Sequence, residues 1–122
     1  NLPAAVLALA IRSERPETAL IVLGRSLGKP PEPLRIGEVY AMLDVMSGGR
    51  LVAGLPVGLS YDANLNNGIP TVETRDRYRE AVELMFRSWT DEAPFTWNGR
   101  FSQYSLVNSW PRPLQRPRPP EP

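Results

Sequence analysis

The pattern of hydrophobic positions in residues 18–55 predicts a strand, a helix and a second strand. Residues 18–24 contain five consecutive apolar positions, which is typical of a parallel strand covered on both faces. Residues 33–47 carry apolar residues at helical spacing, and Gly48 is placed to end that helix in the left-handed conformation. Residues 51–55 form another short apolar run. This order is the unit from which α/β barrels and doubly wound sheets are built.

Two segments flank the first strand. Residues 1–14 are dense in Ala, Val and Leu behind a possible cap at Asn1, which predicts a mostly buried helix. Residues 25–32 are rich in Gly and Pro and predict a loop. On the helix over residues 33–47, we expect the stripe that faces the core to consist of Val39, Met42, Leu43 and Met46.

A third helix is predicted from Thr71 onward, after a long loop over residues 56–70. Thr71 can cap it, and the apolar residues Tyr78, Val82, Met85 and Trp89 then recur at helical spacing. Charged residues four positions apart predict ion pairs that join Glu73 to Arg77, Arg79 to Glu83 and Glu83 to Arg87. We expect these charges to form a solvated outer face and nothing more.

The C-terminal third of the chain predicts a hairpin and an extended tail. Residues 95–97 and 101–104 flank the pair Asn98–Gly99, which suits a tight two-residue turn. Six prolines fall within residues 111–122 and alternate with arginine. Such a segment is extended and has no internal hydrogen bonds, so it needs a neighbour to pack on.

Composition narrows the function classes. The hydrophobic fraction of 42% and the charged fraction of 22% are those of an ordinary globular protein. A net charge of +1 gives no field that would attract nucleic acid, and the apolar stretch 2–11 is too short to span a membrane. The chain has no cysteine and no histidine, which removes thiolate chemistry and the commonest general base. The lack of cysteine is compatible with a cytoplasmic location.

A specific resemblance covers nearly the whole chain. Residues 33–50 read PLRIGEVYAMLDVMSGGR, which resembles the signature of luciferase-like flavin-dependent monooxygenases. Residues 51–58 resemble the next barrel strand of that family, 73–89 the helix after it, and 111–120 the proline-rich lead into a following strand. Gly37 and Val39 depart from the family pattern, and the histidine that some members place near the flavin has no counterpart.

The resemblance implies a partial (β/α)8 TIM barrel of about three βα units, with a small hairpin and a proline-rich tail. A complete barrel needs roughly 250 residues, so we expect the chain to be an internal fragment, and its first residue, Asn1, agrees with that. Residues 1–110 are then a fragment of the barrel domain. Residues 111–122 are an extended segment that leads to the next strand, which is missing.

The resemblance also implies an activity for the parent protein. Family members hold reduced FMN, supplied by a partner reductase, and use dioxygen to oxidise a small organic substrate. A close alternative within the family is hydride transfer by a deazaflavin coenzyme. A different alternative is a truncated barrel that has no activity and only self-associates. A complete protein would form a homo- or hetero-oligomer.

Candidate binding residues follow the predicted strands, because ligands of α/β barrels lie at the carboxyl ends of the strands. The resemblance places the flavin near the first strand end. We therefore expect cofactor contacts from Gly24, Arg25, Ser26, Pro56, Val57 and Gly58, and substrate contacts from Tyr61 and Asn64. The competing interpretation is an ordinary loop with a solvated Arg25. The sequence singles out no catalytic residue, and phosphate-binding residues of the family would lie outside this chain.

One stretch imitates a calcium-binding loop. Asp62, Asn64, Asn66 and Glu73 have nearly the required spacing of oxygen ligands. Asn67, however, stands where the sharp turn of such a loop needs glycine, and a strand rather than a helix precedes it. We therefore predict no metal site.

Overall fold

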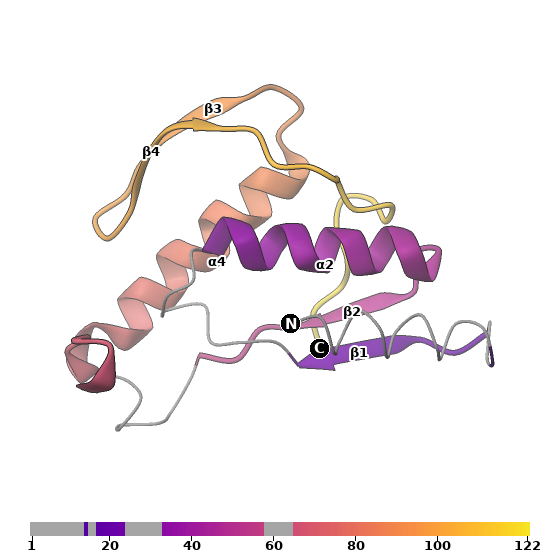
Figure 1. Cartoon of the computed structure of the whole chain (residues 1–122), viewed down its shortest axis with the longest axis horizontal. Helices are drawn as coiled ribbons and strands as arrows, with labels where there is room; N and C mark the ends of the chain where they lie inside the picture. Colours follow the sequence, from indigo (N-terminus) through magenta and orange to yellow (C-terminus); the bar gives the residue numbers. More distant parts are fainter. Residues whose placement is uncertain (1–13, 15–16, 24–32, 58–64) are drawn as a thin grey trace.

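A computed structural model describes residues 14, 17–23, 33–57 and 65–122 of the chain (Figure 1). Within these residues it contains a two-stranded parallel sheet, two long helices and an antiparallel hairpin. In chain order the elements are β1 (Leu20–Leu23), α2 (Pro33–Ser47), β2 (Leu51–Gly54), the 3-10 turn η1 (Thr71–Glu73), α4 (Thr74–Thr90), β3 (Phe95–Asn98) and β4 (Gln103–Val107). This is the predicted partial α/β architecture, with no closed barrel among the described residues.

The strand–helix–strand unit forms as the sequence predicts. β1 pairs with β2 in parallel, in a register that runs from Leu20 opposite Leu51 to Leu23 opposite Gly54. α2 connects the two strands and ends at Ser47, where Gly48 adopts a φ of 72°. Only glycine enters this conformation without strain, so the sequence fixes the end of the helix. The predicted helix over residues 1–14, apart from helical Glu14, and the predicted loop over 25–32 lie outside the described residues.

The buried face of α2 differs from the predicted stripe. Leu43 is fully buried and Val39 packs against the core, but Met42 is 39% exposed. The buried face includes Asp44 instead, whose carboxylate accepts hydrogen bonds from the backbone N–H and the side-chain Nε2 of Gln115 at 2.9 and 2.6 Å. These two hydrogen bonds satisfy both carboxylate oxygens, so the helix presents a polar residue with partners to the interior.

The predicted stripe on α4 is confirmed. Met85 and Trp89 are buried in the main core, and Tyr78 and Val82 pack against it. The indole Nε1 of Trp89 donates to the carbonyl of Gly37 on α2 at 3.0 Å. A Cβ on Gly37 would lie 2.9 Å from Cγ of Met85. The glycine that departs from the family pattern therefore permits the close approach of α2 and α4.

The start of α4 corrects the predicted cap. Thr71 lies in η1, and α4 begins at Thr74 with no side-chain hydrogen bond from the preceding residue, Glu73. The Glu73 carboxylate instead pairs with Arg77 at 2.8 Å, as the spacing predicts. The other two predicted ion pairs are wrong, because each arginine pairs with a different acidic residue. Arg79 lies 3.5 Å from Asp76, and Arg87 lies 2.9 Å from Asp91.

The hairpin forms, but the predicted two-residue turn is wrong. Asn98 pairs with Gln103, so four residues connect β3 to β4, and Gly99 donates its N–H to the carbonyl of Ser102. Gly99 does not have the positive φ that a tight Asn–Gly turn requires. A Cβ at this position would lie 2.5 Å from Cδ of Glu80. The Glu80 carboxylate of α4 thus leaves little room for a side chain at this position.

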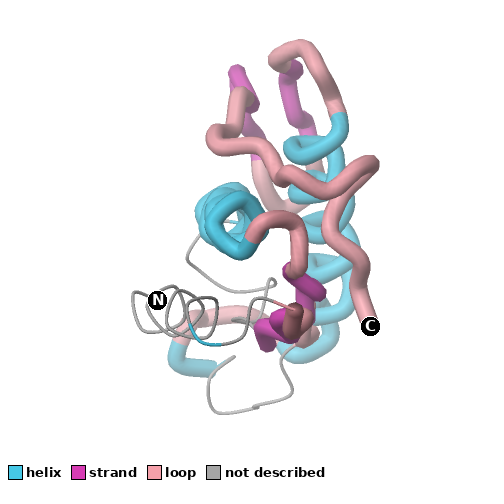
Figure 2. The backbone as a smooth tube through the Cα atoms, turned by 90° about the vertical axis from the view of Figure 1, so that its right-hand side faces the viewer, coloured by secondary structure: helices cyan, strands magenta, loops and turns pink. Residues whose placement is uncertain are grey.

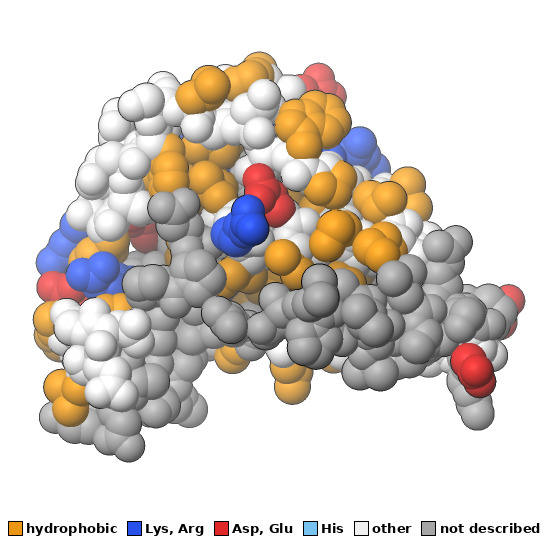
Figure 3. All heavy atoms as spheres, in the orientation of Figure 1, with side chains coloured by type: hydrophobic (Ala, Val, Ile, Leu, Met, Phe, Trp, Pro, Cys, Tyr) orange, Lys and Arg blue, Asp and Glu red, His pale blue; other side chains and the backbone are white. Residues whose placement is uncertain are grey.

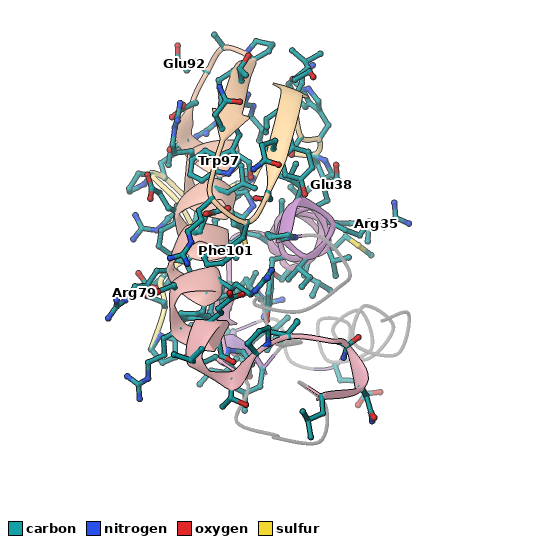
Figure 4. All side chains as sticks on the ribbon, turned by 90° about the vertical axis from the view of Figure 1, so that its left-hand side faces the viewer. Arg35, Glu38, Arg79, Glu92, Trp97 and Phe101 are labelled. Atoms are coloured by element: carbon teal, nitrogen blue, oxygen red, sulfur yellow. The ribbon has the colours of Figure 1, made fainter. Side chains whose placement is uncertain are left out.

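The outer face of α4 holds the hairpin, which corrects the prediction of a purely solvated face. The Glu80 carboxylate accepts hydrogen bonds from the backbone N–H groups of Arg100, Phe101 and Ser102 at 2.7 to 3.1 Å. The guanidinium of Arg87 lies 4.1 Å from the centre of the Phe95 ring, which is a cation–π contact. Figure 4 shows Trp97 and Phe101 between the hairpin and α4, whereas Arg79 points away.

The tail packs on the strand–helix–strand unit. It contains no helix or strand, as predicted, and it runs from the hairpin past α2, on the side of α4, towards β2 (Figure 2). Besides the contact of Gln115 with Asp44, the backbone N–H of Ala53 on β2 donates to the carbonyl of Pro120 at 2.8 Å. The tail therefore reaches the edge of β2 that β1 leaves free.

Candidate functional site

The carboxyl ends of β1 and β2 lie side by side. Leu23 and Gly54 are the last residues of their strands and face each other in the ladder. In α/β proteins, ligands bind at this end of a parallel sheet. Pro56 and Val57, two of the predicted cofactor contacts, follow Leu55 just after the end of β2 and are half-buried. The structure therefore brings these two to the shared edge. The other predicted contacts, Gly24, Arg25, Ser26, Gly58, Tyr61 and Asn64, lie outside the described residues.

The two faces of the parallel sheet differ. Leu20 and Val22 of β1 pack into the core that α2 and α4 cover. Ile21 and Leu23 alternate with them and are 66% and 77% exposed. Side chains alternate between the faces of a strand, so the second face of the sheet presents large apolar groups that none of the described helices covers.

Gly54 is fitted closely to the end of β1. A Cβ at this position would lie 2.5 Å from Cδ2 of Leu23 and 2.8 Å from the carbonyl oxygen of Val22. Real Cβ atoms do not approach backbone oxygens so closely, so a larger residue would force the two strand ends apart. Glycine at this position therefore keeps the edge narrow.

A tyrosine from α2 contacts the backbone of both strands near their ends. The hydroxyl of Tyr40 lies 2.6 Å from the carbonyl oxygen of Gly54 and 3.2 Å from that of Val22. The side chain is almost completely buried. Its ring meets Trp89 edge-on, with 6.5 Å between the ring centres. Helix α2 thus supports the sheet edge through a hydrogen bond as well as through apolar packing.

A tyrosine from α4 contacts the next residue of the same edge. The hydroxyl of Tyr78 donates to the carbonyl oxygen of Leu55 at 2.8 Å. Burial, and to a smaller extent the negative charge of Glu121, raise the pKa of this phenol above its ordinary value. The hydroxyl therefore keeps its proton, and remains a donor, throughout the neutral range.

Sequence reasoning missed both hydroxyls. Tyr78 enters the predicted stripe as an apolar residue, and Tyr40 is not singled out at all. The available signal is chemical: a tyrosine on a buried helical face needs a partner for its hydroxyl. The sequence cannot say which carbonyl that partner is, because Tyr40 and Gly54 are 14 positions apart, and Tyr78 and Leu55 are 23 apart.

The described residues contain no group of three or more acidic side chains that could hold a metal ion. Within the stretch that imitates a calcium loop, Glu73 is engaged by Arg77 through two hydrogen bonds, and Asp62 and Asn64 lie outside the described residues. The shared edge offers other chemistry: backbone carbonyls held by tyrosines, exposed apolar side chains and a narrow glycine.

A hollow among the described residues lies far from the strand ends. It has a volume of about 380 Å³ and is lined by Thr90, Glu92, Arg112, Arg116 and Pro117. Thr90 is the last residue of α4, whereas Tyr78, which contacts the shared edge, lies in the first half of that helix. Arg112 is engaged with the carbonyls of Asp91 and Glu92 and so ties the tail to the end of α4. We assign this hollow no part in the site.

Comparison with known families gives a match along almost the whole chain. Residues 3–122 match the model of the family described as luciferase-like monooxygenase.

No helix within the described residues is both long and apolar enough to cross a bilayer.

Curated relatives differ in the cofactor that their names state. The FMNH2-dependent dimethylsulfone monooxygenase of Pseudomonas putida is 29% identical over 103 residues, which are 82% of this chain and 28% of that protein. The F420-dependent glucose-6-phosphate dehydrogenase of Intrasporangium calvum is 31% identical over 121 residues, which are 93% of this chain and 35% of that protein. The chain thus spans about a third of the length of these relatives.

Among solved structures, the monooxygenase RslO1 from Streptomyces bottropensis has a similar fold. It superposes with a TM-score of 0.83 at 30% sequence identity, and the match covers 97% of this chain and 35% of RslO1. The strand and helix order described above therefore coincides with about one third of a larger enzyme of known structure.

Proposed function

This chain belongs to the luciferase-like monooxygenase family, and from that premise we propose that the complete protein containing it is a flavin-dependent monooxygenase. It would use reduced FMN and dioxygen to oxidise a small organic substrate. The observation that carries this proposal is the shared carboxyl edge of β1 and β2, with its closely fitted Gly54. In barrels of this kind, that edge is where the cofactor and substrate meet.

The residues of this chain would position the cofactor and the substrate, and the cofactor would supply the redox chemistry. When bound, the flavin supplies the reducing equivalents and the reaction with dioxygen. Pro56 and Val57 would contact the cofactor from β2, together with Gly24, Arg25, Ser26 and Gly58. Arg25 carries a permanent positive charge that would stabilise negative charge on a reduced flavin. Tyr61 and Asn64 of the following loop would contact the substrate.

The name of the Pseudomonas putida relative supports reduced FMN as the cofactor. An enzyme that takes up flavin in its reduced form depends on another protein to reduce it, so we propose a partner reductase.

A second candidate is a deazaflavin-dependent oxidoreductase that transfers hydride and does not use dioxygen. The Intrasporangium calvum relative supports it, since its name states F420 and its match covers 93% of this chain. The same shared edge would serve either ring system, because both are flat and tricyclic. The described residues therefore favour neither cofactor over the other.

The relative affinities for the two cofactors distinguish the two candidates. The complete protein is titrated without oxygen with reduced FMN and, separately, with reduced F420, and oxygen uptake is then followed with the better ligand. Tight binding of reduced FMN together with oxygen uptake supports the monooxygenase. Preference for F420 without oxygen uptake supports the dehydrogenase, and binding of neither ligand contradicts both.

A pair of arginine variants tests the proposed site. Arg25→Met should weaken binding of the reduced cofactor by about tenfold or more, because a hydrogen bond from a charged group contributes roughly 1.5–3 kcal/mol. Arg79→Met is the matched control, since Arg79 is exposed on the outer face of α4. Equal affinities for the two variants would show that Arg25 does not contact the cofactor.

A further inference from the structure

We propose that Tyr40 and Tyr78 are positioning residues that fix the backbone at the carboxyl ends of β1 and β2, against which the cofactor lies. The inference rests on the function proposed above and deepens it. Neither hydroxyl needs to touch the cofactor. Each acts through a backbone carbonyl that precedes residues of the proposed site.

The carbonyl of Leu55 is the first of these groups. Leu55 follows the last residue of β2, and the next residue, Pro56, has no N–H with which to continue a ladder. The Tyr78 hydroxyl supplies a donor to this carbonyl at 2.8 Å. A side chain of α4 thereby sets the orientation of the peptide that leads into Pro56 and Val57.

The carbonyl of Gly54 is the second group. The Tyr40 hydroxyl lies 2.6 Å from this carbonyl oxygen and 3.2 Å from that of Val22, so one hydroxyl contacts the backbone near the ends of both strands. A hydroxyl has a single proton to donate, and the shorter distance assigns it to Gly54. The close fit of Gly54 to Leu23 makes the separation of the strand ends sensitive to this contact.

Both tyrosines are themselves held firmly. Tyr40 packs edge-on against Trp89, and Trp89 is fixed by its hydrogen bond to the carbonyl of Gly37. Tyr78 lies on the same helix as Trp89, with its ring against the main core. A contiguous set of contacts therefore runs from α4 through α2 to the sheet edge, and it is rigid because its polar groups are satisfied.

Precise placement matters because both strand ends lead directly into the proposed cofactor contacts. Residues 24–26 follow β1, and residues 56–58 follow β2. Displacement of a bound reactant by about 1 Å can cost a hundredfold in rate, and loosely supported sites are correspondingly poor. Loss of either hydroxyl should therefore change how the cofactor sits more than it changes whether the protein folds.

The test uses Tyr→Phe variants of the complete protein, which remove one oxygen and keep the ring. Tyr78→Phe and Tyr40→Phe are compared with Tyr104→Phe, whose ring packs in the separate cluster beneath the hairpin. The readouts are the dissociation constant of FMN, the visible absorption and circular dichroism of bound FMN at saturation, and the melting temperature. The spectra at saturation report the surroundings of the ring and are insensitive to a small loss of stability.

We expect Tyr78→Phe and Tyr40→Phe to weaken flavin binding by about three- to tenfold, the range that one hydrogen bond supplies, and to alter the spectra of the bound flavin. Tyr104→Phe should leave both unchanged. Unaltered spectra and affinity in Tyr78→Phe would overturn the inference even if Tyr40→Phe fails to fold. Equal changes in all three variants would also overturn it. If the unsubstituted protein binds neither FMN nor F420, the proposed function itself fails.

Discussion

Individual polar groups join parts of the described structure that are distant in sequence. Asp44 on α2 binds Gln115 of the tail, and Tyr78 on α4 binds the carbonyl of Leu55. Gly54 acts in the opposite way, since the absence of a side chain allows the strand ends to approach. Single-atom changes at such positions should have measurable effects on stability, because their surroundings cannot rearrange freely.

Gly54→Ala tests the close approach of the strand ends. The added methyl group meets the backbone oxygen of Val22, which cannot move aside as a flexible side chain could. We expect a loss of about 1–3 kcal/mol in the free energy of unfolding, the usual cost of overpacking. Urea denaturation measures it. An unchanged unfolding midpoint would mean that the strand ends are further apart than described.

The raised pKa of Tyr78 predicts a specific dependence of stability on pH. The folded state holds the phenol proton more tightly than the unfolded state does, so the contribution is complete below the ordinary tyrosine pKa of about 10 and is lost as the pH rises through the raised value. Melting temperatures of the unsubstituted protein and Tyr78→Phe should therefore converge over a window that opens at about pH 10 and extends upward. Parallel curves over that window would contradict the assigned pKa direction.

At the scale of elements, the sequence was informative where a boundary depends on neighbouring residues. α2 has its predicted ends because Pro33 suits a first turn and Gly48 a C-terminal one. The stripe on α4 was also predictable, since its period is local. The hairpin turn was not, because the shape of its loop depends on Glu80, about 20 positions earlier. A local Asn–Gly rule cannot take account of such a contact.

The same distinction applies to the candidate site. Position after a strand is a local property, so the sequence could place Pro56 and Val57 beyond the end of β2, whereas their contact with a cofactor stays a prediction. The role of the two tyrosines could be recognised only from the fold, because their partners are carbonyls on other elements. The burial of Asp44 on α2 could not be predicted for the same reason, since its partner Gln115 lies in the distant tail.

Glu80→Ala tests whether α4 shapes the hairpin. Its carboxylate accepts bonds from three successive backbone N–H groups and from the hydroxyl of Ser102. We expect a loss of about 1–3 kcal/mol in unfolding free energy and faster amide exchange at residues 100–102. Glu83→Ala on the same helix is the control, because Glu83 is exposed. Similar behaviour of the two variants would show that the hairpin holds its own loop.

At the scale of the whole molecule, large apolar groups remain exposed on the described residues. Met42 and Val45 of α2, Ile21 and Leu23 of β1, and Leu114 of the tail are each more than a third exposed. Figure 3 shows apolar side chains over α2 and the segment above it, interrupted by a basic and an acidic residue. Such surfaces are typical of interfaces or of faces that a larger domain covers.

The 122-residue chain alone should therefore associate. We expect light scattering to give a mass above the 13.6 kDa of one chain, increasing with concentration. The complete protein should bury Ile21 and Leu23 within its barrel, so Leu23→Lys should reduce association of the short chain and destabilise the complete protein. A strictly monomeric short chain would contradict this interpretation of its exposed faces.

The most direct test of the account is a crystal structure of the complete protein with its flavin bound. The account predicts that the ring system lies within about 4 Å of residues 55–57, beside the end of β1, with Tyr40 and Tyr78 still bound to their carbonyls. A flavin bound elsewhere, for example in the hollow between Thr90 and Arg112, would contradict it.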